Sequence, residues 1–341
     1  MELSDLLCLH RSFGINQNER LRQVINTGQM PSSITCDLAA LQADLSWFNG
    51  EQRFLLSMAD PDYPALLKQI PDPPPLLYCR GNRESLRRPK VAMVGSRSPT
   101  HSGIRSAREL AAEFVRLGIT VVSGLALGID AASHRGALGA GGVTIAVLGS
   151  GCDVIAPRQH ETLAAEIASD GLVVSEYPLG TAPYPGNFPR RNRVVTGLSM
   201  GTLVVEAALK SGSLVSARLA LEQGREVFAV PGSIRSPQSK GCHELLRNGA
   251  VLTEAVDDII PELRCLHDFE VSASVALIDS PQAEVLTETQ TKLLRMLSTD
   301  PIHIDELCAV MEIEISELMS ALLALEIRGE IVAVPGGYVI G

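Results

Sequence analysis

A seven-residue stretch from Asn187 to Arg193 carries the residue types most suited to holding a nucleic acid. Besides Asn187 and Pro189, it contains one phenylalanine, a second asparagine and three arginines: Phe188, Asn192, Arg190, Arg191 and Arg193. Proteins hold a flexible single strand with cations that follow its phosphates and with aromatic rings on which its bases stack. The stretch therefore predicts capture of single strands without a sequence code. Two simpler interpretations remain open: a solvated basic loop, and Phe188 as a plug of the hydrophobic core.

Glycines and small polar residues follow three short apolar runs upstream of this stretch. They are Gly95, Ser96 and Arg97 after the first run, Ser123 and Gly124 after the second, and Gly149 and Gly151 after the third. Glycine lets a backbone approach a ligand closely, and a helix that starts after such a loop offers free N–H groups to an anion. The guanidinium of Arg97 has a fork geometry that suits phosphate. Together the loops predict a phosphate-binding rim, although any one of them alone could simply form a tight turn.

Signals of catalysis or of a bound dinucleotide are weak. Gly149 and Gly151 are followed by Val154 at the position where a dinucleotide-binding fingerprint needs a third glycine. Glu206 could act as a general base, but no nucleophile lies beside it in the sequence, and a structural role is favoured. We assign the polar residues that follow the same strand to DNA binding instead: Lys210, Ser211 and Ser213. We expect no enzyme activity, no catalytic residue and no cofactor.

Cysteine and histidine spacing gives no metal site. The seven cysteines are scattered without a C-x-x-C pair, and an odd number of them is typical of reduced thiols in a cytoplasm. No apolar run approaches the 18 residues of a membrane span, and the first residues lack a signal-peptide pattern. We expect a cytoplasmic protein without a metal and without a membrane anchor.

The formal net charge of −10 is unfavourable for phosphate binding, but the acidic residues are unevenly distributed. Residues 1–79 carry a net charge of −4 and residues 281–341 carry −7, whereas residues 80–280 carry +1. Within the central part, residues 80–193 contain 14 basic and 9 acidic groups. A basic surface on the central part is therefore compatible with the overall charge.

Short apolar runs alternate with helical patterns through the middle of the chain. The predicted strands are Lys90–Val94, Thr120–Val122, Val143–Leu148, Leu172–Val174, Thr202–Val205 and Glu226–Val230, and examples of the predicted helices are Gly103–Leu117 and Leu214–Gln223. Buried strands that alternate with helices indicate an α/β fold, a parallel sheet with helices on both faces. Ligands of such sheets bind at the carboxyl ends of the strands, where the glycine-rich loops lie.

The two ends of the chain have a different character. Before residue 50 the pattern predicts short helices, such as Asn18–Thr27 and Leu38–Leu45, followed by a proline-rich connector. Near the C-terminus three helical patterns and a hairpin predict a winged helix over residues 287–341. Its third helix has Glu314, Glu317 and Glu326 against Arg328, so we expect it to contact protein or to be purely structural. The expected boundaries are 1–59 (helical domain), 60–265 (α/β domain), 266–286 (linker) and 287–341 (winged helix).

The loops of the central part, taken together, resemble those of the DprA/Smf family. The matching motifs are Val94-Gly95-Ser96-Arg97, Ser123-Gly124-Leu125-Ala126, Ser175-Glu176-Tyr177-Pro178, Phe188-Pro189-Arg190-Arg191-Asn192-Arg193, Ser211-Gly212-Ser213-Leu214 and Val227-Phe228-Ala229-Val230-Pro231-Gly232. They occur in order and at the family's spacing from about residue 60 to residue 256. One departure is Ile155-Ala156-Pro157 followed by His160, where the family has Tyr-Pro and then Asn.

The resemblance implies an extended Rossmann domain with an N-terminal helical, SAM-like domain and a small C-terminal domain. It also implies a non-enzymatic recombination mediator that binds single-stranded DNA, including DNA coated with SSB, and loads RecA onto it in natural transformation. Family members form homodimers through the Rossmann domain. Carried over by position, the DNA pocket includes Gly95, Ser96 and Arg97, the Gly124 loop, and Phe188 with the three arginines that follow it.

Two other functions remain open. A nucleotide phosphoribohydrolase of the lysine-decarboxylase-like family would have a related sheet, but its Pro-Gly-Gly-x-Gly-Thr-x-x-Glu motif is represented only by Gly201, Thr202 and Glu206. A winged-helix transcription factor would need residues 281–341 to bind duplex DNA, and their net charge of −7 argues against that.

Overall fold

The computed structural model describes residues 1–31, 34, 36–263, 287–297, 301–311, 313–327, 330–334 and 336–340. The chain forms two compact units. The larger unit takes in most of the chain up to residue 263, and the smaller one contains the described residues from 287 onward. The linker expected at 266–286 lies outside the described residues.

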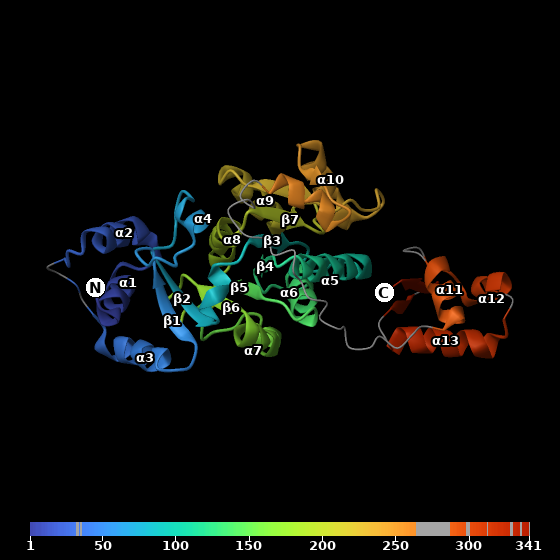
Figure 1. Ribbon diagram of the computed structural model, residues 1–341, viewed down its shortest axis with the longest axis horizontal. Coiled ribbons are helices and arrows are strands. Elements are labelled where there is room, and N and C mark those ends of the chain that lie inside the picture. Colours follow the sequence, from blue (N-terminus) through green and yellow to red (C-terminus); the bar gives the residue numbers. More distant parts are fainter. Residues whose placement is uncertain are drawn as a thin grey trace. The chain divides into compact units, whose positions relative to one another are not determined.

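A nine-stranded sheet forms the centre of the larger unit (Figure 1). Its strands are β1 (Arg53–Ser57), β2 (Leu76–Gly81), β3 (Lys90–Val94), β4 (Thr120–Ser123), β5 (Thr144–Leu148), β6 (Leu172–Ser175), β7 (Gly201–Val204), β8 (Glu226–Ala229) and β9 (Val251–Leu252). They lie in the order β1-β2-β6-β5-β4-β3-β7-β8-β9. Every pairing from β6 to β9 is parallel, whereas β1 with β2 and β2 with β6 are antiparallel. The predicted parallel sheet is confirmed, with an antiparallel extension at one edge.

The six strands predicted from the sequence all form in the structure. Residues of β3 to β7 are buried throughout, because helices cover both faces of the sheet, and such strands consist of continuous apolar runs. Three strands were not predicted. Of these, β9 has only two residues, and β1 and β2 stand on either side of the proline-rich connector.

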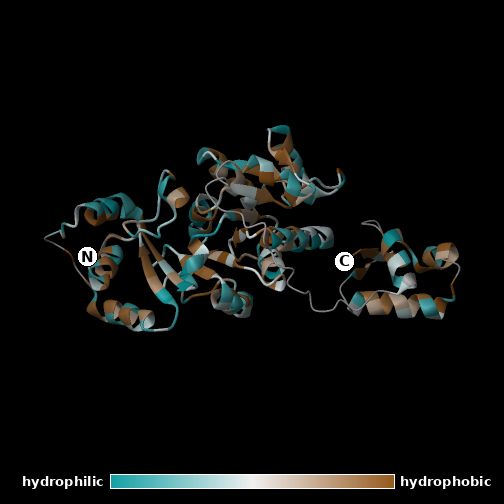
Figure 2. Cartoon of the chain, in the orientation of Figure 1, coloured by the Kyte–Doolittle hydropathy of each residue, from teal (hydrophilic) through white to brown (hydrophobic). Residues whose placement is uncertain are grey.

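Six helices pack on the two faces of the sheet. They are α5 (His101–Arg116), α6 (Ile129–Gly139) and α7 (Glu161–Asp170) on one face, and α8 (Asn187–Gly197), α9 (Gly212–Glu222) and α10 (Lys240–Arg247) on the other (Figure 1). The strands between them are mostly hydrophobic, while the helices alternate hydrophobic and hydrophilic residues (Figure 2). This is the amphipathic pattern of helices that bury one side against a sheet.

Helices at the start of the chain pack beside the antiparallel strands. They are α1 (Leu3–Phe13), α2 (Asn18–Thr27) and α3 (Leu38–Phe48), followed by the single-turn α4 (Ala65–Lys68). Leu9, Phe13, Leu21 and Val24 of the first two helices form a small core with Leu76 of β2. Short 3₁₀ turns lie at Ile15–Gln17, Arg83–Leu86, Arg158–His160, Pro237–Ser239, Val256–Asp258 and Ile260–Glu262.

The smaller unit has the predicted winged-helix composition. It contains α11 (Glu288–Met296), α12 (Ile304–Met311) and α13 (Ile315–Ile327), and the hairpin of β10 (Ile331–Val334) and β11 (Gly337–Ile340). Its core includes Leu293, Leu307, Leu318 and Ile331. Across the described part of both units, every helix is too short or too polar to cross a lipid bilayer.

Candidate nucleic-acid interface

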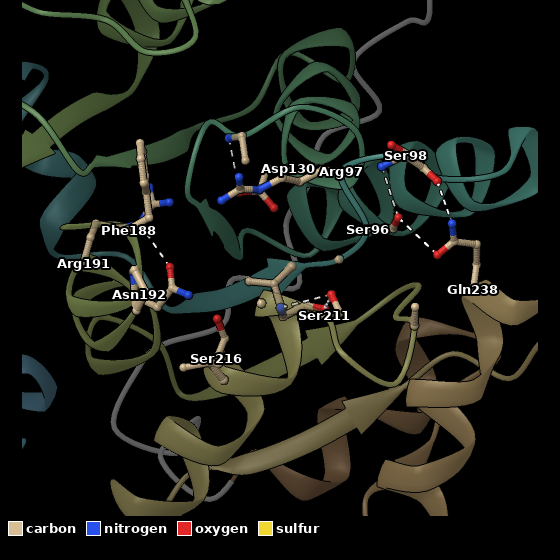
Figure 3. A pocket seen from close by; sticks show the side chains of 18 of the residues that line it. Ser96, Arg97, Ser98, Asp130, Phe188, Arg191, Asn192, Ser211, Ser216 and Gln238 are labelled. Atoms are coloured by element: carbon tan, nitrogen blue, oxygen red, sulfur yellow. Dashed lines mark hydrogen bonds between the residues drawn. The ribbon is translucent and has the colours of Figure 1, made fainter. Parts of the chain in front are cut away.

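A cavity of about 670 Å³ opens at the carboxyl ends of the central strands. From β3 the chain builds β4, β5 and β6 on one side and then β7, β8 and β9 on the other, so the strand order reverses between β3 and β7. Such reversal points are where open α/β sheets bind ligands. The cavity is lined by Val94, Gly95, Ser96, Arg97, Ser98, Ala126, Asp130, Pro185, Phe188, Pro189, Arg191, Asn192, Ala208, Ser211, Gly212, Ser213, Val215, Ser216 and Gln238 (Figure 3).

Arg97 and Phe188 form the part of this lining that is most suited to a nucleotide. The guanidinium carbon of Arg97 lies 5.7 Å from the centroid of the Phe188 ring, within the range of a cation–π contact. Arg97 is exposed, and no carboxylate among the described residues forms an ion pair with it. A free guanidinium beside an aromatic ring can contact a phosphate while the ring supports a base.

Hydroxyl and amide groups line another part of the cavity. Ser96 Oγ donates to Gln238 Oε1 over 3.4 Å, and Gln238 Nε2 donates to the carbonyl oxygen of Ser98 over 3.1 Å (Figure 3). These bonds join the loop after β3 to the segment after β8. They place uncharged donors and acceptors next to Arg97, where they can bind the sugar-phosphate chain.

The N-terminus of α9 borders the same cavity. Ser211 caps this helix by accepting from the Ser213 N–H over 3.3 Å, and its Oγ lies 2.6 Å from Ser213 Oγ. The Ser211 N–H donates to the carbonyl oxygen of Ala208, so this helix end contributes mainly the Gly212 backbone and the partial positive charge of the helix dipole. Because Ser211, Gly212 and Ser213 all line the cavity, this end of α9 suits an anion.

Arg191 lines the cavity but is held by the protein itself. Its side chain is buried, and its guanidinium donates to the carbonyl oxygens of Gly124 and Val147. A Cβ atom at position 124 would lie 2.5 Å from Arg191 Nη2, so only glycine leaves room for this contact. Arg191 therefore adds positive charge to the cavity while fixing the loop after β4.

Asp130 is the acidic residue of the cavity. It is buried and accepts hydrogen bonds from the N–H groups of Gly124 (3.1 Å) and Ala126 (3.3 Å). Burial raises the pKa of Asp130, and the nearby charge of Arg191 opposes this shift. Burial likewise lowers the pKa of Arg191, and Asp130 opposes that shift in turn. The two groups hold the loop after β4 as a unit.

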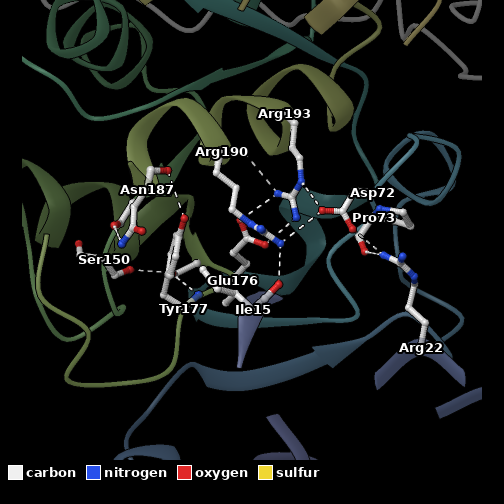
Figure 4. A network of polar contacts seen from close by, with 12 residues as sticks. Ile15, Arg22, Asp72, Pro73, Ser150, Glu176, Tyr177, Asn187, Arg190 and Arg193 are labelled. Carbon is white, nitrogen blue, oxygen red and sulfur yellow. Dashed lines mark hydrogen bonds and ion pairs between the residues drawn. The ribbon is translucent and has the colours of Figure 1, made fainter. Parts of the chain in front are cut away.

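Arg190 and Arg193 lie on the opposite face of α8, away from the cavity (Figure 4). Arg193 donates to both carboxylate oxygens of the buried Glu176, over 2.8 and 2.7 Å. Arg190 Nη2 donates to the carbonyl oxygen of Ile15 over 2.6 Å and lies 3.3 Å from Asp72 Oδ2. We expected these arginines to lie beside Arg97. The structure does not bring them there, because Arg190 and Arg193, three residues apart, share the face of α8 that is turned away from the cavity lining.

Asp72 joins the N-terminal helices to this network. Besides Arg190 and Arg193, it accepts from Arg22 Nη1 over 2.8 Å (Figure 4). Burial alone would raise the pKa of Asp72, but the three guanidinium groups outweigh it and lower this pKa below its usual value. The counter-charges that the sequence stretch lacks are thus supplied by Glu176 and Asp72.

The other predicted residues are not part of the cavity lining. Ser123 is buried and donates to the carbonyl oxygen of Met93 over 2.6 Å. Gly149 lies behind Phe188, where an added Cβ would approach the ring to 3.0 Å. Gly151 N–H donates to the carbonyl oxygen of Thr181 over 3.0 Å. Lys210 is exposed next to the cap of α9.

Several residues of the cavity lining were not predicted as binding residues from the sequence. Ser98, Asp130, Ser216 and Gln238 line the cavity, and only Asp130 has a sequence signal, since it opens a helix directly after a glycine-rich loop. Glu206, the candidate general base, is buried and is not part of the lining. Within the described residues, no cluster of three or more histidine, cysteine, aspartate or glutamate side chains could hold a metal ion.

Comparison with protein families gives two matches. The model of DNA recombination-mediator protein A matches residues 54–264, and the model of the DprA winged helix domain matches residues 279–337. The Smf protein of Escherichia coli strain K12 is 40% identical over 301 residues, which cover 88% of this chain and 80% of that protein.

The solved structures of two DNA processing proteins are similar to this one. DNA processing protein A from Streptococcus pneumoniae superimposes with a TM-score of 0.69 and 35% identity, covering 77% of this chain and 99% of that one. DNA processing protein A from Helicobacter pylori, whose structure addresses its single-stranded DNA binding mode, gives a TM-score of 0.56 and 35% identity. That match covers 63% of this chain and 97% of the other.

Proposed function

This chain belongs to the DprA/Smf family of DNA recombination mediators, and from that premise we propose that it holds single-stranded DNA in the cavity between the ends of β3 and β7. The observation that carries the proposal is the free guanidinium of Arg97 over the ring of Phe188, inside a cavity that also contains the N-terminus of α9. Cations, an aromatic ring and helix N–H groups are what a sequence-independent single-strand site requires.

We assign the roles of the cavity residues by their chemistry and by the contacts they already make within the protein. Arg97 forms an ion pair with a phosphate, and the ring of Phe188, which contacts the Arg97 guanidinium, stacks with a base. The α9 N-terminus with Ser211 and Ser213 binds a second phosphate, and Gly95, Ser96 and Asn192 contact the strand between these points. Arg191 contributes its charge from beneath the surface rather than by direct contact.

Further partners follow from the family premise. We propose that the bound single strand, including strand coated with SSB, is handed to RecA in the cytoplasm during natural transformation. We also propose that two copies of the larger unit associate as a homodimer. No enzymatic step is needed for such a role.

The smaller unit supports contact with protein rather than with duplex DNA. Ile315, Met319 and Leu323 are exposed at four-residue intervals along α13. Glu314 and Glu317 lie at the start of the same helix. The carboxylates repel phosphate, whereas a row of exposed hydrophobic side chains on one helix face can pack against another protein.

Titration with fluorescent oligo-dT and with a duplex of the same length tests the proposal. We expect oligo-dT to bind much more tightly than the duplex, with the logarithm of affinity falling by about 0.7 per contacted phosphate for each tenfold increase in salt. Equal affinity for both nucleic acids, or affinity that does not respond to salt, would contradict it.

A further inference from the structure

Tyr184 is a large aromatic side chain exposed beside the cavity. Its relative exposure is 66%, and among the described aromatic residues it alone is classed as exposed. A single exposed apolar side chain is common and needs no explanation by itself. Tyr184 is a candidate for ligand contact because of its position: the next residue, Pro185, belongs to the cavity lining.

The backbone around Tyr184 is fixed before any ligand binds. Pro183 and Pro185 restrict the chain on both sides of it. The carbonyl oxygen of Tyr184 accepts from the Asn187 N–H over 2.9 Å, which ties it to the first residue of α8. Earlier in the same segment, the Gly180 N–H donates to Asp153 Oδ1 over 2.9 Å. A ligand that meets this loop therefore loses little free energy in ordering it.

The ring of Tyr184 is contacted along one edge, while most of the side chain is open to solvent. A Cβ atom added at Gly186 would lie 3.0 Å from Tyr184 Cε1 and 3.3 Å from its Cδ1, so this edge of the ring lies next to Gly186. Gly186 is the N-cap of α8, two residues before Phe188. Tyr184 and Phe188 thus flank the start of one helix, the first exposed and the second beneath Arg97.

We propose that Tyr184 is a second base-stacking position, which takes a nucleobase next to the one held at Phe188. The inference rests on the proposed binding of single-stranded DNA and extends the binding path from the cavity onto the loop before α8. Aromatic rings on which successive bases stack accept any base, since every base has a π-face. Tyr184 then adds affinity through bases, whereas Arg97 and the α9 N-terminus add it through phosphates.

Two oligonucleotides of equal length separate these contributions: oligo-dT and a fully abasic strand. We expect Tyr184→Ala to weaken oligo-dT binding about tenfold and to leave abasic-strand binding within twofold of wild type. Tyr184→Phe keeps the π-face and is expected to bind oligo-dT within twofold of wild type. Leu38→Ala, which removes an exposed side chain in α3, is a control expected to change neither affinity.

A fluorescent reporter tests stacking directly. The chain has one tryptophan, Trp47, so Trp47→Phe combined with Tyr184→Trp leaves a single indole at the proposed position. We expect oligo-dT to quench its emission and the abasic strand not to do so.

The outcomes distinguish this inference from the function on which it rests. Loss of both affinities in Tyr184→Ala, or no loss in either, would overturn the stacking role while wild-type binding of oligo-dT still supports the cavity. If wild-type protein bound no single-stranded DNA, the proposed function itself would fail.

Discussion

The two faces of α8 use the same residue type for different purposes. On one face, Phe188, Arg191 and Asn192 line the cavity, and on the other, Arg190 and Arg193 are paired with Glu176 and Asp72. Of the two arginines that line the cavity, Arg97 and Arg191, only Arg97 is exposed to solvent, and it lies in the loop after β3. A basic cluster in a sequence therefore shows how many positive charges a segment carries. How many of them can bind a ligand depends on which are already paired with carboxylates in the folded protein.

The largest expected effect comes from the paired face. Glu176→Ala removes the buried carboxylate that Arg193 pairs with over 2.7 Å and leaves its guanidinium only the more exposed Asp72; removal of one partner of a buried ion pair costs about 3–5 kcal/mol. Urea unfolding should record this loss, with affinity for oligo-dT changed less than by Arg97→Ala. Glu222→Ala, which breaks the exposed pair with Arg218, is the matched control and should stay within about 0.5 kcal/mol.

Arg191 tests whether the cavity face is purely a binding face. Arg191→Ala removes the donor from two buried carbonyl oxygens, and each unsatisfied group costs about 1–3 kcal/mol. We expect lower stability in urea together with weaker binding of oligo-dT, because the loop after β4 loses its support. Weaker binding at unchanged stability would mean that Arg191 meets the DNA directly.

Arg97 differs from Arg191 because its guanidinium is exposed and does not hold a loop of the protein in place. Arg97→Ala is expected to raise the dissociation constant for oligo-dT about tenfold, or about 1.4 kcal/mol, and to change stability by less than about 0.5 kcal/mol. The salt dependence should become shallower by about one phosphate contact. Arg218→Ala removes the same charge from an exposed site on α9 and should bind as wild type does. Equal binding by Arg97→Ala would remove the main support for the cavity as the DNA site.

The smallest effect concerns Asp72 and depends on pH. Its pKa is lowered in the folded protein, so its stabilising contribution is complete above the unfolded-state pKa of about 3.9 and is lost as the pH falls through the lower folded-state value. Since its side chain is 41% exposed, we expect Asp72→Asn to cost at most about 1 kcal/mol at pH 7. Urea unfolding of both proteins at pH 7, 5 and 3 should show the difference shrinking only at the lowest pH. A difference that persists at pH 3 would assign the role of Asp72 to something other than its charge.

The central sheet could be predicted because buried parallel strands leave continuous apolar runs, as at Thr144–Leu148. The loops at the strand ends could be predicted as well, since Gly95, Ser96 and Arg97 follow such a run directly. The antiparallel strands could not be, because a proline-rich segment separates β1 from β2 and masks their pairing.

The division of the arginines was hidden for a different reason. Glu176 is 17 residues from Arg193, and Asp72 is 121 residues from it, so no local pattern shows the pairing. The open alternative of a solvated basic loop is wrong: the stretch forms the start of α8, since the proline at position 189 is tolerated in the first turn of a helix. Gln238 has no signature at all, and it reaches the cavity only because the segment after β8 turns back toward Ser96.

The antiparallel edge of the sheet limits how the chain can be shortened. β1 covers β2 along its length, from Arg53 opposite Arg80 to Ser57 opposite Leu76. A fragment that starts at residue 60 would keep β2 and strip its outer neighbour, leaving a row of bare N–H and C=O groups open to a strand from another molecule. Such a fragment would self-associate through this exposed strand edge. A loss of DNA binding in the fragment would then result from self-association rather than from the loss of a residue that contacts DNA.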